Sequence, residues 1–276
     1  MIPIQYALRR RMMMAALGSG IDVSALSITY TGAHTDYGMV TMSDGARYRL
    51  LAFTSSGTLS IEQPVNCEVC VVGGGANGTK ATKSGGGDGG AGAYLKSQSV
   101  SAYNGGSVVV GARQGVSSIA DVSVNKVSGK NGGTGAGGET AGTGDGISKY
   151  PFEDTGYSLW AGKPHCGGGG QGVYEWDTGG DSTLGYKGGN GGTNGGNGYS
   201  RPGNRVSSPS GGVGGSYGGG GGAGANHTAA NGGKATYYGS GAGGGRYYEN
   251  ADGDVTLGNG GSGYQGIVYM RIPVIQ

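Results

Sequence analysis

The chain has 276 residues, 70 of them glycine, with a formal net charge of +2 at pH 7 and 13% charged residues. So small a net charge predicts neither a nucleic-acid partner nor membrane insertion, and there is no run of about 18 apolar residues to form a transmembrane helix. Three cysteines are too few for a disulfide scaffold, and 18 tyrosines with few charges favour order over disorder.

The N-terminal segment, residues 1–20, contains the chain's only cluster of strong helix formers and predicts a short α-helix. Pro3 suits its first turn and Gly18 its C-terminal cap. A signal peptide is the alternative, because three arginines precede an apolar stretch. That stretch has about six residues, fewer than the roughly 7–15 that a signal peptide needs. We expect a helix whose apolar face packs on a partner or on copies of the same chain; this face comprises Ile4, Leu8, Met12 and Ala15.

Strand-forming sequence lies on both sides of the glycine-rich region. Residues 21–62 read as strands, with a hairpin turn at 55–57 joining 47–54 to 58–61. Because the two ends bracket the glycines, we expect them to share one sheet. The predicted fold is an all-β base, sandwich-like or jelly-roll-like, of residues 21–127 completed by 266–274. Further strands are expected over 67–72, 94–100, 107–111 and 119–127.

Glycine dominates the rest of the chain: residues 129–266 hold 50 of the 70 glycines. Glycine loses the most backbone entropy on ordering and has no side chain to bury, so an ordinary helix or hydrophobic core is excluded. Such a region is either disordered or packed by its backbone alone, as extended left-handed helices with three residues per turn. Collagen is excluded because a strict Gly-X-Y period is absent. We expect a polyglycine II helix bundle over residues 128–265, inserted into the base.

Three stretches carry a resemblance to a known family. They are residues 51–61 (Leu-Ala-Phe-Thr-Ser-Ser-Gly-Thr-Leu-Ser-Ile), 69–75 (Val-Cys-Val-Val-Gly-Gly-Gly) and 260–272 (Gly-Gly-Ser-Gly-Tyr-Gln-Gly-Ile-Val-Tyr-Met-Arg-Ile). With the glycine field between them, they resemble glycine-rich domains of bacteriophage tail proteins over residues 46–274. The pattern is similar, more loosely, to the extracellular glycine-rich domain of certain receptor tyrosine kinases. The phage resemblance implies a lattice of polyglycine II helices whose loops contact a host receptor, with residues 1–45 facing the virion.

Motifs typical of enzymes occur without their structural context. Residues 73–78 fit the dinucleotide-binding pattern G-x-G-x-x-G, but neither a helix nor an acidic residue about 20 positions further on follows. Residues 214–218 fit the nucleophile elbow G-x-S-x-G, yet no strand precedes them and no helix follows. No acid pair for glycoside hydrolysis stands out among the 17 acidic residues. We therefore predict neither an enzyme nor a cofactor.

Motifs that resemble metal-binding and RNA-binding sites are likewise incomplete. Cys67 and Cys70 have zinc-ligand spacing, with the His-Cys pair at 165–166 as further ligands. Residues three apart in a strand point to opposite faces, which favours buried thiols. The acidic turns at 144–146 and 252–254 are each shorter than a calcium-binding loop, so solvated turns are favoured there. Arg246 is an isolated arginine–glycine motif, whereas RNA-binding segments repeat it. No metal site is predicted.

Aromatic residues interrupt the glycine runs. A glycine lattice has no interior room for them, so we expect them at turns or on faces. Exposed tyrosine and tryptophan beside Asn, Ser and Gly form an adaptable binding surface; the alternative is that they only cover the lattice edges. The candidate receptor-binding residues are Tyr157, Trp160, Tyr174, Trp176, Tyr199, Tyr237, Tyr238, Tyr247 and Tyr248.

Two functions of different class follow from these features. The first is a virion tail-fibre or tail-tip adhesin that binds host cell-surface carbohydrate or protein. The second is a purely structural virion part, such as a head fibre, decoration or baseplate spike. In both, residues 1–20 attach the chain to other virion tail or fibre proteins. A homotrimer, or membership of a trimeric fibre, is expected by analogy with phage fibres and because a short helix is unstable alone.

Overall fold

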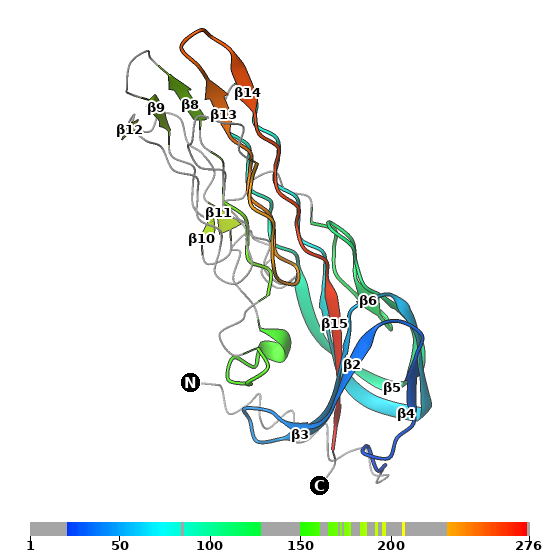
Figure 1. Ribbon diagram of the computed structural model, residues 1–276. Helices are drawn as coiled ribbons and strands as arrows, with labels where there is room; N and C mark the ends of the chain where they lie inside the picture. Colours follow the sequence, from blue (N-terminus) through cyan, green and yellow to red (C-terminus); the bar gives the residue numbers. More distant parts are fainter. Residues whose placement is uncertain are drawn as a thin grey trace.

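The computed structural model describes three long stretches, residues 21–83, 86–127 and 231–274, together with shorter pieces between them. The molecule is elongated: a β-sheet base lies at one end, glycine-rich segments run away from it, and a small second sheet lies at the far end (Figure 1). Among the described residues, no helix is long and apolar enough to cross a membrane. The predicted helix at 1–20 lies outside the described residues. The shorter described pieces are 150–160, 165–170, Gly172, 174–177, 183–186, 191–192, 195–196 and 206–207.

The base is a single eight-stranded sheet, which confirms the expectation of an all-β base. Its strands follow the order β2-β3-β15-β4-β5-β6-β7, and β1 pairs with β4. All of these pairings are antiparallel. The strands are β1 (Ile28–Tyr30), β2 (His34–Thr41), β3 (Arg47–Phe53), β4 (Gly57–Val72), β5 (Leu95–Val109), β6 (Ser118–Ile119), β7 (Val122–Ser123) and β15 (Ile267–Pro273).

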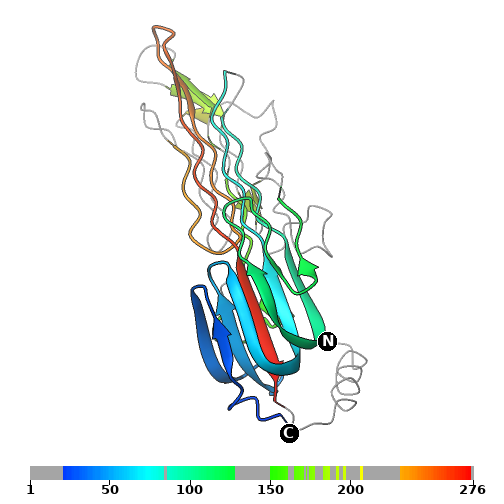
Figure 2. The ribbon, with the colours of Figure 1, turned by 90° about the vertical axis from the view of Figure 1, so that its right-hand side faces the viewer.

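The last strand, β15, lies in the middle of this sheet. It pairs with β3 on one side and with β4 on the other, as Figure 2 shows in red between blue and cyan. The two ends of the chain therefore share one sheet, as expected. The predicted hairpin at residues 55–57 is wrong, because β15 separates the two strands that this turn connects. All but the last residue of β15 are buried, and a strand that is buried on both faces requires a central position.

Strands β4 and β5 are long and bent. Their mutual register shifts between Ser60 and Val65 and again between Val65 and Cys67. Bulges of this kind bend a strand, and here they let both halves of β4 line the same core. Leu59 comes from the first half of β4 and Val69 from the second, and both lie in one buried cluster.

The outer face of the sheet is covered by residues 150–160, which include the short 3-10 helix η2 (Pro151–Glu153). The Asp154 carboxylate attaches this segment to the β2–β3 turn, because it accepts hydrogen bonds from both the backbone N–H and the hydroxyl of Ser43. The indole N–H of Trp160 donates to the Asp154 carbonyl over 2.6 Å. This segment therefore packs on the base, and the same buried cluster includes Ala93 and Cys166 from the glycine-rich part.

Six glycine-rich segments run side by side from the base toward the far end (Figures 1 and 2), and we call them the stalk. They form an array of hydrogen bonds with a period of three residues. The N–H groups of Gly73, Ala76 and Thr79 donate to one neighbouring segment, and those of Gly75, Gly78 and Ala81 donate to another. The stalk segments are residues 73–81, 87–94, 165–172 (of which Gln171 is not described), 231–235, 239–246 and 258–266.

Segment 239–246 is hydrogen-bonded to all five other stalk segments. A strand in a flat sheet bonds to two neighbours in one plane, so the stalk is not a sheet. Successive N–H groups of this segment, from Gly241, Ala242 and Gly243, donate to three different segments. Two stalk segments, 73–81 and 87–94, precede residue 128, so the glycine-rich part draws on more of the chain than the expected 128–265.

Close approach of the backbones explains the glycines. A Cβ atom added to Gly244 would lie 1.8 Å from the carbonyl oxygen of Gly87, and one added to Gly169 would lie 1.8 Å from that of Ala242. No real Cβ contact is so short. Each such segment can therefore carry a side chain only at positions that face a gap, as the fully buried methyl groups of Ala76 and Ala242 do.

The far end of the stalk carries a five-stranded sheet, which we call the distal sheet, in the order β12-β9-β8-β13-β14. Strands β8 and β13 are parallel, and the other pairs are antiparallel. The glycine strands β10 and β11 pair only with each other. The bounds are β8 (Tyr174–Asp177), β9 (Thr183–Tyr186), β10 (Gly191–Gly192), β11 (Gly195–Gly196), β12 (Val206–Ser207), β13 (Tyr247–Glu249) and β14 (Val255–Leu257).

Candidate binding surfaces

The distal sheet brings together four of the predicted site residues. Tyr174 and Trp176 lie on β8, and Tyr247 and Tyr248 lie on the adjacent strand β13. Tyr174 is the register partner of Tyr247 and also of Tyr186 on β9. Three tyrosine positions therefore form one row across the sheet, although they come from distant parts of the chain.

Side chains on β13 differ in their exposure. Tyr247 is only 3% exposed, and its hydroxyl donates a hydrogen bond of 2.7 Å to Glu249. The prediction that Tyr247 contacts a receptor is therefore corrected: this ring supports the sheet from within. Tyr248 is half-buried, and the guanidinium of Arg246 lies 4.7 Å from the centre of its ring. Arg246 itself is fully buried, which excludes an exposed arginine–glycine segment at this position.

An exposed turn joins β13 to β14 at the tip of the molecule (Figure 1). The side-chain oxygen of Asn250 accepts hydrogen bonds from the backbone N–H groups of Asp252 and Asp254, over 3.1 and 2.6 Å. Gly253 has a φ of +85°, which a turn of this kind requires. The predicted solvated turn is thus confirmed at 252–254, while the second acidic turn, at 144–146, lies outside the described residues.

A second group of aromatic residues lies where the stalk meets the base. The rings of Tyr237 and Tyr238 are 5.5 Å apart, and that of Tyr264 lies 5.6 Å from Tyr238. Burial raises the pKa of Tyr157, Tyr237 and Tyr238, and the neighbouring phenol of Tyr37 raises each of them further. These five residues, Tyr37, Tyr157, Tyr237, Tyr238 and Tyr264, are called the junction tyrosines below.

Three buried aromatic residues form the floor beneath the junction tyrosines. The ring of Tyr269 lies 5.6 Å from that of Trp160 and 5.6 Å from that of His165, and the His165 Nε2 atom lies 3.0 Å from the Tyr269 hydroxyl. The ring of Tyr237 stacks edge-on to His165 at 4.9 Å. Trp160 has no exposed surface. The prediction that Trp160 contacts a receptor is therefore wrong: its ring packs between the base sheet and Tyr157.

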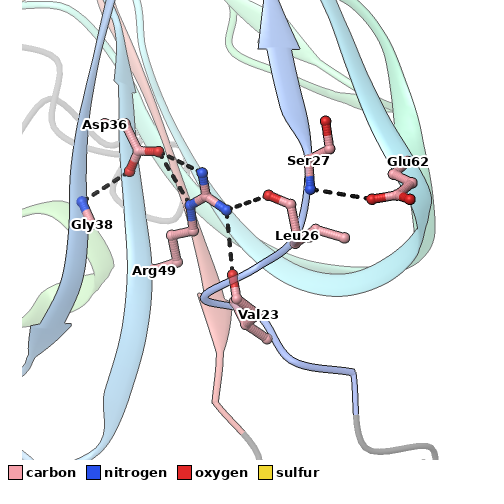
Figure 3. Close-up of polar contacts among 7 residues, drawn as sticks. All are labelled: Val23, Leu26, Ser27, Asp36, Gly38, Arg49 and Glu62. Carbon is pink, nitrogen blue, oxygen red and sulfur yellow. Dashed lines mark hydrogen bonds and ion pairs between the residues drawn. The ribbon is translucent and has the colours of Figure 1, made fainter.

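Tyr37 owes its position to a bulge in β2. The pairing of β2 with β3 shifts between Asp36 and Met39, and Gly38 has a φ of +64°. One oxygen of the Asp36 carboxylate accepts a hydrogen bond from the Gly38 N–H over 2.8 Å, and the other accepts two from Arg49, over 3.1 and 2.7 Å (Figure 3). The second Arg49 amino group donates to the carbonyl of Leu26 over 2.5 Å. This network fixes the bulge.

Electrostatics at the bulge favour the ionised carboxylate. Burial works to raise the pKa of Asp36, but hydrogen bonds from Arg49 and Gly38 and the Arg49 charge outweigh it, so that this pKa falls below its ordinary value of 3.8. Asp36 and Arg49 are therefore both charged and paired at neutral pH. Tyr37, the residue after Asp36 in the bulge, is 41% exposed.

Sequence reasoning missed Tyr37 and Tyr264. It searched for aromatics that interrupt glycine runs, whereas Tyr37 lies in a base strand and Tyr264 in the last stalk segment. A signal for Tyr37 was present: an isolated glycine, Gly38, inside a strand pattern indicates a bulge, and bulges re-aim side chains. Tyr199, also predicted, lies outside the described residues.

The cysteines are buried free thiols, as predicted. Cys67 and Cys70 belong to different hydrophobic clusters on opposite faces of β4. Burial raises the pKa of Cys67 to about 12, with a contribution from Glu68, and that of Cys70 to about 11. Both thiols stay protonated at neutral pH, which is unsuited to zinc. Within the described ranges, no group of three or more His, Cys, Asp or Glu residues is placed to hold a metal ion.

The two aromatic surfaces, the distal sheet and the junction tyrosines, are the candidate binding surfaces. No protein-family model matches the chain, and the comparisons with curated proteins and with solved structures likewise give no significant match.

Proposed function

We propose that this protein is a bacteriophage tail-fibre or tail-tip protein that binds the host surface with its distal end. One observation carries the proposal: the base and the distal sheet lie at opposite ends of the stalk (Figure 1), and the first and last described residues, Ile21 and Val274, both pack against the core of the base. A chain anchored through its base would thus hold the distal sheet away from the particle. Such a layout suits a spike that presents a contact surface.

The stalk is, in this proposal, a polyglycine II bundle. Helices of this type have three residues per turn and no internal hydrogen bonds, so that their polar groups must pair with neighbouring helices. The three-residue period of the stalk hydrogen bonds and the five neighbours of segment 239–246 both support it. At about 3.1 Å per residue, a segment of eight residues extends roughly 25 Å.

Such a bundle would be stiff, which the function requires. Each stalk segment is fixed by hydrogen bonds in several directions, as Gly244 illustrates: its N–H donates to Gly170, and the carbonyl of the next residue accepts from Gly87. Bending would break bonds to several neighbours at once. Because the excursions 73–94 and 239–266 leave from the base and return to it, the entropy lost in ordering their glycines is also limited.

The receptor contacts are assigned to the distal sheet and its turns. Tyr174 and Trp176 on β8 and Tyr248 on β13 are the candidates that remain at this end, with the exposed turn at 250–254 beside them. Aromatic side chains provide contact area at a low entropic cost, and polar turn residues provide hydrogen bonds. The receptor is a host cell-surface carbohydrate or protein.

Adsorption of the fluorescently labelled full chain to cells of the host bacterium tests this proposal. We expect Trp176→Ala and Tyr248→Ala each to weaken adsorption about tenfold, as loss of an aromatic hot spot does. Val109→Ala, an exposed residue of the base, is the matched control and should leave adsorption unchanged. Adsorption that stays unchanged in both distal variants would contradict the assignment of the contact surface.

A purely structural spike is the second candidate function, and the burial of Tyr247 favours it, because this ring stabilises the distal sheet. This alternative predicts that Trp176→Ala and Tyr248→Ala lower the melting temperature and that the unaltered protein does not adsorb to cells. In either case we propose attachment through residues 1–20 and a trimeric assembly. Deletion of residues 1–20 should release the protein from the particle; normal incorporation of the deletion variant would reject this attachment.

A further inference from the structure

We infer that the junction tyrosines form a second binding surface, which takes a neutral oligosaccharide. This surface lies at the opposite end of the stalk from the distal sheet. The inference does not depend on host attachment, because sugar binding is a property of the isolated protein. It is built from chain segments that lie far apart in the sequence.

Four of the five rings belong to one group that ring contacts connect. Tyr237, Tyr238 and Tyr264 are linked by ring separations of 5.5 and 5.6 Å, and Tyr157 joins them through the buried Trp160, Tyr269 and His165. The fifth, Tyr37, lies on the β2 bulge, and its phenol raises the pKa of the half-buried Tyr157, Tyr237 and Tyr238.

The group is exposed in a way that a stabilising core is not. Tyr37 is 41% exposed and Tyr264 is 37% exposed, which places both among the most exposed large apolar residues of the described chain. Tyr157, Tyr237 and Tyr238 are half-buried. Single exposed aromatics are ordinary, but a contiguous group of them marks a binding surface.

The surface is also held rigidly. Tyr37 sits on the bulge that the Asp36–Arg49 pair fixes (Figure 3), and Tyr237 and Tyr238 rest on the buried ring of His165. The backbone of Tyr264 is bonded on both sides within the stalk, to Ser240 and Gly75. Rigid rings lose little entropy on binding, so the surface is organised before a ligand arrives.

The chemistry of the surface fits a neutral sugar. A sugar ring has an apolar C–H face that lies against an aromatic ring and hydroxyls that exchange hydrogen bonds with phenols. Two carboxylates beside the surface are both occupied: Asp36, next to Tyr37 in the chain, pairs with Arg49, and Asp154 accepts hydrogen bonds from Ser43 and from the N–H of Tyr157. Burial raises the pKa of Tyr157, Tyr237 and Tyr238, so these three phenols offer neutral donors at neutral pH rather than charge.

The test titrates the full-length protein with neutral oligosaccharides of glucose, galactose, mannose or N-acetylglucosamine, followed by calorimetry and tyrosine fluorescence. We expect at least one of these probes to bind. Tyr37→Ala and Tyr264→Ala should each raise its Kd about tenfold, in the range of lost aromatic hot spots. Tyr37→Phe should raise it less, because the ring face remains. Val116→Ala, a base residue that is 40% exposed, is the matched control.

Three outcomes overturn the inference. The first is that no probe binds. The second is that Val116→Ala raises the Kd as much as the tyrosine variants do. The third is that Tyr37→Ala changes the oligomeric mass while sugar binding is unchanged, which would make this surface a contact between copies. The melting temperature of each variant shows whether it folds, and Tyr264→Ala serves where Tyr37→Ala does not fold. The two proposals fail separately: Trp176→Ala acts on adsorption to cells and leaves the sugar titration unchanged.

Discussion

Side chains stabilise the base, whereas backbone groups stabilise the stalk. In the base, apolar side chains such as Phe53, Leu50 and Met270 are fully buried, and removal of their surface from water stabilises the fold. In the stalk, the backbone packs on itself, and its N–H and C=O groups pair in several directions. The base is therefore sensitive to atoms that are removed, whereas the stalk is sensitive to atoms that are added.

The largest effect is expected for Gly244→Val in the stalk. A Cβ at this position meets the carbonyl of Gly87 at 1.8 Å, and the obstacle is backbone that cannot turn away. We expect a loss of stability above about 4 kcal/mol, which is exceptional for one substitution. Chemical denaturation measures it. Gly253→Ala is the control, since its added Cβ meets no atom within 4 Å and only its positive φ opposes it. Equal losses in the two variants would contradict close backbone packing.

The opposite change, Phe53→Ala in the base, removes atoms from a closed core. Phe53 has no exposed surface and packs on Tyr30 with ring centres 4.7 Å apart. We expect a loss of about 3–5 kcal/mol, the usual cost for truncating a buried phenylalanine. Thermal unfolding followed by circular dichroism measures it. Truncation of the exposed Val109 should cost far less, and a similar loss there would argue against a side-chain-driven base.

A smaller effect is expected where a covering segment is attached to the base. Asp154→Ala removes the acceptor for Ser43, Gly156 and Tyr157, and so deletes three part-buried hydrogen bonds to a charged group. The expected cost is about 1–3 kcal/mol. Trp160 should gain exposure, which a red shift of its fluorescence reports. The variant Asp121→Ala, at an exposed position, is the control. Unchanged emission in Asp154→Ala would show that packing alone holds the segment.

The smallest effect concerns pH. The pKa of Asp36 is lower in the folded protein than its ordinary value of 3.8, so the Asp36–Arg49 pair stabilises the fold above that pH. This contribution is lost as the pH falls below 3.8 and through the folded pKa. We expect Asp36→Asn to flatten the decline of the melting temperature over this range. Superimposable pH profiles of the two proteins would contradict it.

Local sequence patterns determined much of the base. Alternating and β-branched residues are enough to indicate strands at both ends of the chain, and the three-residue spacing of Cys67 and Cys70 placed their thiols on opposite faces. The position of β15 between β3 and β4 could not be predicted in this way. A turn predicts that its flanking strands pair, but a strand from the far end of the chain, buried on both faces, took the place between them.

The sequence by itself determined that the glycine-rich region, where it is ordered, must pack by its backbone, because glycine has no side chain to bury. Only the tertiary structure decided which segments lie together, including the early ones at 73–81 and 87–94. Because glycine has no side chain, the sequence carries no pattern that specifies which stalk segments pair. The hydrogen-bond geometry and the attachment of the segments to the base select the pairs. For the same reason Trp160 is buried while Tyr37 and Tyr264 are exposed: the exposure of a side chain depends on which distant segments pack against it, and no local sequence pattern records that.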